Sequence, residues 1–158
     1  PLAPAPAQHY HVEAAREVYE DVLSSWGIAE TQHVIADGSG LSRYNCLTAH
    51  MLVTILRQMA RDSRHAAAFD ATLPIAGKDG TLERRMKGTR AENNVHAKTG
   101  TISNVRSLSG YVRTRDNELI GFSIIGNNFK ARSATIDAVA ELAVERLANF
   151  TREASKPR

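Results

Sequence analysis

The sequence has almost no cysteine. Cys46 is the single example, so the chain cannot form an internal disulfide or a cysteine-rich metal site. It also has no apolar run near the ~20 residues that a membrane-spanning helix needs, and no signal-peptide pattern. Blocks of like charge are missing too. The formal net charge is only +3, and basic and acidic residues are interspersed, which does not favour nucleic-acid binding.

What remains is an ordinary globular composition. The chain has 158 residues, of which 42% are apolar, enough for one domain with a real core. Residues 1–11 begin with alternating Pro and Ala and predict a linker. His9 and His11 within it form a His-x-His pair, but no third ligand is near, so we predict no metal site. The polar stretch 151–158 predicts a frayed tail.

Hydrophobic periodicity predicts a mixture of helices and strands. Residues 62–94 show no regular pattern, and their basic group (Arg84, Arg85, Lys87 and Arg90) predicts a solvated surface. Thr48 and Ser133 are suitable helix N-caps. The predicted helices are 12–26, with Val18, Val22, Leu23 and Trp26 inward, 49–61, and 134–150, with Ile136, Val139, Ala140, Ala143 and Leu147 inward. The predicted strands are 34–36, 95–101, 107–114 and 119–126, with a hairpin turn at 115–118.

Residues 95–101 carry the most informative pattern, Val-His-Ala-Lys-Thr-Gly-Thr. The alternation is typical of a strand, yet Gly100 weakens a strand unless another group must approach closely. Lys98 supplies a mobile positive charge, Thr99 a short hydrogen bond and Gly100 room. Together they suit an anionic, extended ligand held against a strand edge, although a solvated strand end is an alternative.

A second informative stretch is residues 37–45, Asp-Gly-Ser-Gly-Leu-Ser-Arg-Tyr-Asn. Two glycines and several hydrogen-bonding side chains predict a tight loop braced by its own side chains. Ser39 resembles a nucleophile in Gly-Ser-Gly, but a nucleophile elbow needs glycine where Asp37 stands. A structural loop is therefore the favoured interpretation.

Three motifs in order carry a family resemblance: the loop 37–45, the stretch 73–82 (Leu-Pro-Ile-Ala-Gly-Lys-Asp-Gly-Thr-Leu) and Lys98-Thr99-Gly100. Lys-Thr-Gly is a signature of penicillin-recognising serine enzymes. From about residue 12 to 150 the chain resembles the C-terminal part of the D-alanyl-D-alanine carboxypeptidase/endopeptidase family, the low-molecular-mass class C penicillin-binding proteins. The resemblance implies an α/β (α+β) penicillin-binding, β-lactamase-like fold, in which an antiparallel sheet is flanked by helices.

The chain departs from that family in one respect. The family's nucleophile lies in Ser-x-x-Lys and its second motif is Ser-x-Asn, and neither pattern occurs in these 158 residues. In the family both motifs precede the loop that 37–45 resembles. We therefore expect the chain to be the C-terminal segment of a longer enzyme, whose N-terminal part carries both motifs.

The resemblance also implies roles for individual residues. Lys98 would hold the substrate's terminal carboxylate, and Thr99 would hydrogen-bond to it. Gly100 would let the peptide lie along the strand. The Thr101 backbone N–H would be one donor of the oxyanion hole.

Two further positions follow from the same comparison. Arg43 would contact a side-chain carboxylate of the substrate, although an arginine bracing its own loop is nearly as plausible. Ser103 stands where relatives may carry a longer amide side chain, and it would contact the substrate.

The implied activity is serine-type hydrolysis of peptidoglycan stem peptides through an acyl-enzyme, with β-lactams as further ligands. No cofactor is implied, and the location would be periplasmic or extracytoplasmic. Two alternatives stay open: a catalytically dead homologue that binds cell-wall peptide or another partner, and a β-lactamase or esterase on the same fold. The chain alone is expected to be inactive.

The strand at 119–126 leads to one more expectation. It is apolar on both faces and carries neither charge nor proline, and an exposed edge of that kind promotes aggregation. We therefore expect it to be hydrogen-bonded along both edges, by residues 107–114 and by a polypeptide outside this chain.

Overall fold

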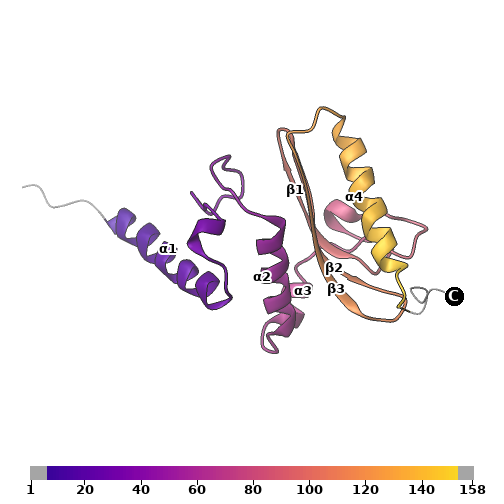
Figure 1. Ribbon diagram of the computed structural model, residues 1–158, viewed down its shortest axis with the longest axis horizontal. Coiled ribbons are helices and arrows are strands. Elements are labelled where there is room, and N and C mark those ends of the chain that lie inside the picture. The colour runs from indigo at the N-terminus through magenta and orange to yellow at the C-terminus, as the bar shows by residue number, and fades with distance from the viewer. Residues whose placement is uncertain (1–6, 153–158) are drawn as a thin grey trace, which may run out of the picture. The chain divides into compact units, whose positions relative to one another are not determined.

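The computed structural model describes the backbone of residues 7–152 and the side chains of residues 14–152. The chain divides into two compact units, residues 1–51 and 52–158. The elements in order are α1 (Ala7–Ser25), η1 (Glu30–Gln32), α2 (Ala49–Arg61), α3 (Ala66–Asp70), η2 (Gly80–Leu82), β1 (His96–Ile102), β2 (Val105–Arg113), β3 (Leu119–Asn127) and α4 (Ser133–Ala148) (Figure 1).

The larger unit is built on an antiparallel sheet in the order β1-β2-β3. Its register pairs Ala97 with Gly110 and Gly110 with Phe122. Gly110 is required by this register, because a Cβ there would overlap the backbone of β1 at His96 and Ala97. The two strands therefore approach closely at the centre of the sheet.

One face of the sheet packs against α4. The shared core contains Ala97, Leu108, Val112, Phe122, Ala140 and Val144, all buried. Gly126 lies directly under Ile136 of α4, with room for no larger residue unless Ile136 moves. Burial of this many apolar side chains is the main force that holds α4 to the sheet.

The opposite face of the sheet carries Tyr111, whose hydroxyl donates a 2.6 Å hydrogen bond to the carbonyl of Leu56 in α2. Phe69 of α3 meets the same ring edge-on at 6.4 Å between ring centroids. Burial raises the pKa of Tyr111 to about 12. Helices therefore cover both faces of the sheet, as predicted.

Several predicted elements are confirmed, one with the predicted ends and the others with shifted ends. The helix at 49–61 is α2, and the Thr48 hydroxyl accepts a 3.1 Å bond from the Met51 N–H, as an N-cap should. The three sheet strands lie within two residues of their predicted ends. The two-residue turn at 103–104, with Asn104 in the left-handed region (φ 59°), was not predicted.

The prediction for α4 needs two corrections. Arg132 is the N-cap and no side chain caps the helix, so Ser133 does not have the predicted role. The buried stripe is Ala140, Val144 and Ala148, whereas Val139 is 60% exposed. Ala143 is exposed as well. Ala140 is buried and Leu147 packs against the core, as predicted, so the inward face agrees only in part with the one expected.

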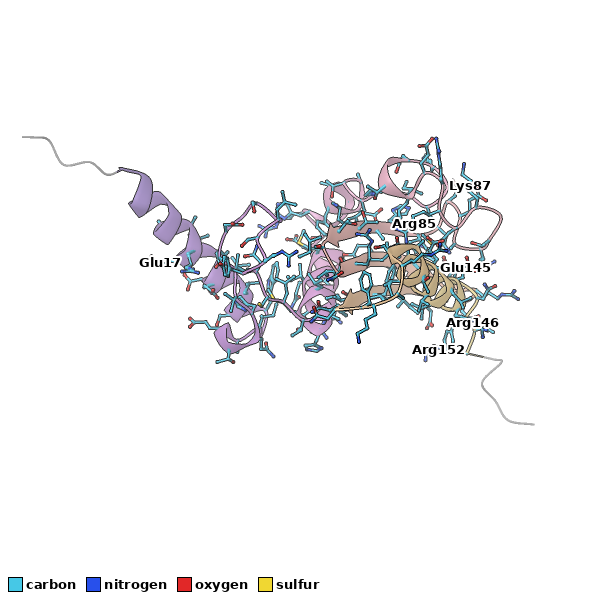
Figure 2. The ribbon with its side chains drawn as sticks, turned by 90° about the horizontal axis from the view of Figure 1, so that it is seen from above. Glu17, Arg85, Lys87, Glu145, Arg146 and Arg152 are labelled. Atoms are coloured by element: carbon cyan, nitrogen blue, oxygen red, sulfur yellow. The ribbon has the colours of Figure 1, made fainter. Side chains whose placement is uncertain are left out.

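The basic group after η2 is not simply a solvated surface. Arg85 is half-buried and its Nε donates a 2.6 Å bond to Glu141 of α4, while Arg90 donates to the carbonyl of Ala148. Figure 2 labels Arg85 and Lys87 on this loop and Glu145 on α4. Two of the four basic residues thus tie the loop to α4, and Lys87 is exposed as predicted.

β3 confirms only part of the expectation for residues 119–126. It pairs with β2 along one edge. Among the described residues no strand pairs with its other edge, so the outside partner stays a prediction. The prediction that both faces of β3 are buried is wrong for this chain by itself. Phe122 is the single buried residue of the strand, and Leu119 is 48% exposed.

The smaller unit contains α1, η1 and the loop that follows. α1 begins at Ala7, so residues 7–11, predicted as linker, are helical, and residues 1–6 lie outside the described part. The side chains of His9 and His11 lie outside it too. The predicted inward stripe is largely wrong, because Val18 is 65% and Val22 40% exposed while Leu23 is buried.

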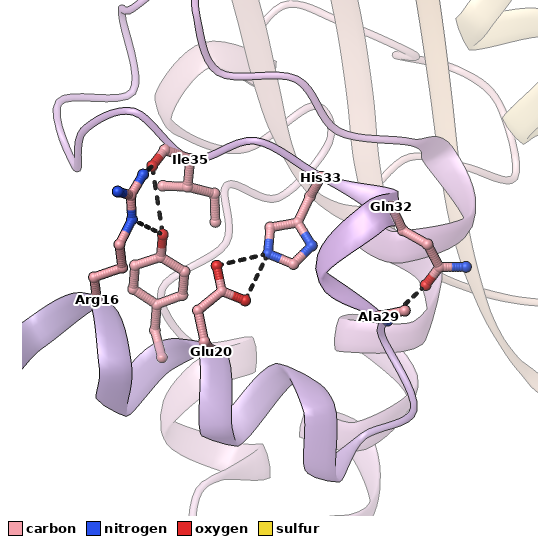
Figure 3. Close-up of polar contacts among 7 residues, drawn as sticks. Arg16, Glu20, Ala29, Gln32, His33 and Ile35 are labelled. Carbon is pink, nitrogen blue, oxygen red and sulfur yellow. Dashed lines mark hydrogen bonds and ion pairs between the residues drawn. The ribbon is translucent and has the colours of Figure 1, made fainter.

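Polar contacts connect α1 to the segment after η1 (Figure 3). Arg16 donates a 2.9 Å bond to the carbonyl of Ile35, and Tyr19 donates to the same oxygen at 3.4 Å. The buried His33 ring meets Glu20 at 3.0 Å through Nε2. Val34 forms a single antiparallel bridge with Cys46 in place of the predicted strand at 34–36. Polar contacts therefore join α1 to this segment, beside the buried apolar residues Leu23 and Ile28.

Candidate functional site

The outer edge of β1 is the centre of the candidate site. The Ala97 N–H donates a 2.9 Å bond to the carbonyl of Pro74, on the side of β1 away from β2. Peptide groups alternate in direction along a strand, so those of Thr99 and Thr101 face the same outer edge. Past the bridge between Ile75 and His96, no described segment pairs with this edge. The Thr101 N–H therefore lies on an edge that can accept an extended peptide.

Lys98 is exposed, and its ammonium group is held at this edge. Its Nζ donates a 2.8 Å bond to the carbonyl of Thr99. By the same alternation that carbonyl points outward, which brings the positive charge toward the open side of β1. An ammonium has three donors, so two remain for a carboxylate.

Thr99 lies on the other face of β1, and its hydroxyl donates a 3.0 Å bond to the hydroxyl of Thr81 in η2. Sequence reasoning did not predict Thr81 as part of the site. The turn that carries it is fixed by Asp79, which accepts a 2.7 Å bond from the Ile75 N–H, and by the fully buried Leu82. Thr81 belongs to the motif at 73–82, but only the fold shows that it lies beside Thr99.

Packing within the chain also requires a glycine at position 100, in addition to the room that we expect it to leave for a ligand. A Cβ on Gly100 would overlap the Oγ of Ser107 on β2. The close approach inferred from the sequence is therefore to a neighbouring side chain of this chain. Ser103, in contrast, is exposed in the turn after β1, so its side chain is accessible to a ligand at that end of the strand.

The loop that contains Arg43 is braced as predicted, within the unit of residues 1–51. Asn45 Oδ1 accepts bonds from the N–H groups of Ala36 and Asp37 at 2.7 and 3.3 Å. Asp37 accepts from both the N–H and the hydroxyl of Ser39, which holds the pKa of Asp37 below its ordinary value. Ser39 is thus a loop-bracing residue in this geometry.

Arg43 itself takes no part in that bracing. It is exposed, and within residues 14–152 it makes no hydrogen bond or ion pair. The alternative that this arginine holds its own loop is therefore not supported. Its guanidinium is available to a planar acid.

A cavity of about 340 Å³ adjoins the start of β1. His96, on the same face of β1 as Lys98, meets Asp70 of α3 at 2.8 Å through Nδ1. Within the described side chains no cluster is suited to a metal ion. No helix of the described part is long and apolar enough to cross a membrane.

The chain is similar in sequence to a known protein family and to several curated proteins. A family model described as the D-Ala-D-Ala carboxypeptidase 3 (S13) family matches residues 3–147. A D-alanyl-D-alanine carboxypeptidase of Actinomadura sp. (strain R39) is 45% identical over 128 residues, which cover 77% of this chain and 23% of that protein. Penicillin-sensitive carboxypeptidase A of Dictyostelium discoideum is 34% identical over 146 residues, which cover 87% of this chain and 27% of the relative.

Among solved structures, penicillin binding protein 4 (dacB) from Haemophilus influenzae, complexed with a novel beta-lactam, superimposes with a TM-score of 0.72 at 27% identity. The match covers 82% of this chain and 32% of that one. The predicted fold class is confirmed. The chain spans about a quarter of the length of these curated relatives.

Proposed function

Since this chain belongs to the D-Ala-D-Ala carboxypeptidase 3 (S13) family, we propose that it is the C-terminal segment of a serine D-alanyl-D-alanine carboxypeptidase/endopeptidase. Its part would be to bind a peptidoglycan stem peptide along the outer edge of β1. The observation that supports this most is that edge itself. It presents the Thr101 N–H to an incoming strand, and the Lys98 ammonium lies beside it on the Thr99 carbonyl.

The proposed chemistry is acyl transfer in two steps. A serine outside these residues attacks the carbonyl between two D-alanines, its Oγ bonds to that carbon, and D-alanine leaves with the proton. Water then hydrolyses the ester. The Thr101 N–H would donate to the oxyanion in both steps, and one such donor is typically worth about 3 kcal/mol in the transition state.

The remaining residues would position the substrate. Lys98 and Thr99 would bind its terminal carboxylate, and Thr81 would orient the Thr99 hydroxyl through the 3.0 Å bond between them. Gly100 would let the peptide lie along the strand. Arg43 would contact a side-chain carboxylate of the substrate, and Ser103 would also contact the substrate.

The partners would follow from this role. They are the stem peptide, β-lactams that acylate the same serine, and the N-terminal part of the enzyme that carries Ser-x-x-Lys and Ser-x-Asn. Because peptidoglycan lies outside the cytoplasmic membrane, the location would be periplasmic or extracytoplasmic. None of these steps uses a cofactor.

One observation favours a second candidate. No Ser-x-x-Lys occurs in these 158 residues, as expected also of a catalytically dead homologue that binds cell-wall peptide without cleaving it. Such a protein would bind stem peptides at equilibrium but release no D-alanine.

The test is Lys98→Ala in the complete protein, with D-alanine release from a stem peptide as the readout. Loss of a charge-assisted contact costs ~1.5–3 kcal/mol, so kcat/KM should fall about 10- to 100-fold. Lys130→Ala, an exposed lysine outside the site, is the matched control and should retain parental activity. A value for Lys98→Ala within twofold of the parent would contradict the role, and an inactive parent that binds the peptide would identify the dead homologue.

A further inference from the structure

Three arginines lie around one open pocket at the end of the sheet opposite the turn at residues 103–104. Arg90 comes from the loop before β1, Arg113 ends β2, and Arg115 belongs to the turn that follows. The pocket has a volume of about 330 Å³, and its remaining lining residues are Asn94, Thr114 and Asn117. No lining side chain is acidic.

Each of these arginines is held by a neutral acceptor. Arg90 Nε donates to the carbonyl of Ala148 at 3.0 Å. Arg113 Nη1 donates to the carbonyl of Asn117 at 3.2 Å, and Arg115 Nη2 donates to Asn149 Oδ1 at 3.2 Å. A guanidinium has five N–H donors, so most of the donors remain available. Within residues 14–152 none of the three forms an ion pair.

The two acidic groups of the same turn are already engaged elsewhere. Asp116 accepts 2.7 Å and 2.9 Å bonds from the Arg152 N–H and the Thr151 hydroxyl, and these bonds hold its pKa below the ordinary value. Glu118 pairs with Arg152 at 2.7 Å, and Figure 2 labels Arg152 close to where the described part of the chain ends. Neither carboxylate lines the pocket, so three positive charges share it without a counter-ion.

We propose that this pocket binds a phosphate group. Guanidinium groups bind phosphate through paired N–H···O bonds, and an anion among three arginines would also remove their mutual repulsion. The pocket does not include the strand edge of Lys98, so the inference is independent of the proposed acyl transfer.

The adjoining 340 Å³ cavity indicates where the rest of a phosphorylated molecule would lie. Arg113 and Asn94 line both spaces, and the cavity continues over Ala66, Ala67 and Leu119. Its one carboxylate, Asp70, meets the His96 ring at 2.8 Å. A phosphomonoester would thus place its phosphate on the arginines and its organic part against this more apolar wall.

The experiment measures thermal unfolding of the full chain at pH 7 over a range of inorganic phosphate concentrations, against sodium chloride of matched ionic strength. Saturable stabilisation by phosphate, absent in chloride, is expected. Arg113→Gln and Arg115→Gln should each weaken the apparent affinity about tenfold, because each removes charge-assisted bonds. Equal unfolding midpoints in phosphate and chloride for the parent chain would overturn the proposal, whether or not either variant folds.

Two controls separate charge from structure. Asn149→Ala removes the acceptor that holds Arg115 but keeps the guanidinium, and Arg84→Gln removes an exposed arginine outside the pocket; both should bind phosphate with nearly parental affinity. Parental affinity in Arg113→Gln and Arg115→Gln would also overturn the site. Glycerol 3-phosphate gives the second arm. If glycerol 3-phosphate binds more tightly than inorganic phosphate, the cavity holds the organic part of the ligand. If the two bind equally, the site recognises the phosphate group alone.

Discussion

At the scale of single residues, Arg43 gives the sharpest test of substrate recognition. Its side chain is exposed and, within residues 14–152, unpartnered, so Arg43→Ala should leave stability unchanged. If it binds a substrate carboxylate, the variant should lose about tenfold in kcat/KM on a substrate with a side-chain carboxylate. On the matching amide it should lose almost nothing.

The comparison of the two substrates is the measurement for Arg43. Arg57→Ala, another exposed arginine without a described hydrogen bond or ion pair, serves as control and should behave as the parent on both. Equal losses on both substrates in Arg43→Ala would show that this arginine does not read the carboxylate.

A second residue-scale prediction concerns pH. Asp62, after α2, accepts hydrogen bonds from His65 and from the Arg64 N–H, and these bonds lower the pKa of Asp62 to about 2. A carboxylate with a lowered folded-state pKa stabilises the protein above its unfolded-state pKa of about 4 and loses that contribution as pH falls toward 2. Asp62→Asn should therefore destabilise the chain at pH 7, and less so as the pH approaches 2.

Urea unfolding from pH 2 to pH 7 measures this difference. Glu83→Gln changes an exposed carboxylate that has no ion pair within the described residues, and its difference from the parent should stay small at every pH. A gap for Asp62→Asn that stays constant from pH 7 to pH 2 would contradict the assignment.

Residue-scale predictions from the sequence succeeded where the chemistry is local. Asn45 and Asp37 brace their own loop and Thr48 caps α2, since each acts within a few residues or across one short loop. The predictions failed where the partner of a side chain is distant in the sequence. Arg85 is occupied by Glu141, 56 positions away in the chain, and no local pattern contains that information.

At the scale of elements, the glycines of the sheet provide a graded test. Gly110→Ala should destabilise the chain by about 1 to 3 kcal/mol or more, because the new methyl group meets β1 backbone that cannot move freely. Gly100→Ala meets only the Oγ of Ser107, which can rotate, so its cost should be smaller. The double variant Gly100→Ala/Ser107→Ala should recover most of that cost.

Thermal unfolding of the three variants provides the comparison. Activity adds a second readout, because Gly100→Ala can impair peptide binding at the edge even where stability is restored. Equal stabilities of Gly110→Ala and Gly100→Ala would show that the register between β1 and β2 is not as described.

Elements were predictable in type and less so in extent. The period-two pattern located all three strands, but the two-residue turn at 103–104 was missed because Ser-Asn is a weak turn signal compared with Asn-Gly. In α1 and α4 part of the apolar stripe was assigned to the wrong side chains, although Leu23 and Ala140 are buried as predicted. Residues such as Val18 and Val139 fit a helical stripe, yet they are exposed in this chain. The helical period alone does not show which face of the helix packs against the rest of the chain.

At the scale of the whole molecule, the fold class and the Lys-Thr-Gly edge could be predicted because they rest on ordered motifs. The contact of Thr99 with Thr81 could not, since it depends on where residues 73–82 return to the sheet. In the proposed function the outer edge of β1 binds the substrate, and the nucleophile comes from elsewhere in the protein.

The most direct measurement is therefore to locate the acylated serine. The complete protein is treated with a fluorescent penicillin, denatured and digested, and the labelled peptide is identified by mass spectrometry. We expect one labelled serine, three residues before a lysine and outside these 158 residues, with slower labelling in Lys98→Ala. A stoichiometric label on any serine within residues 1–158 would contradict it.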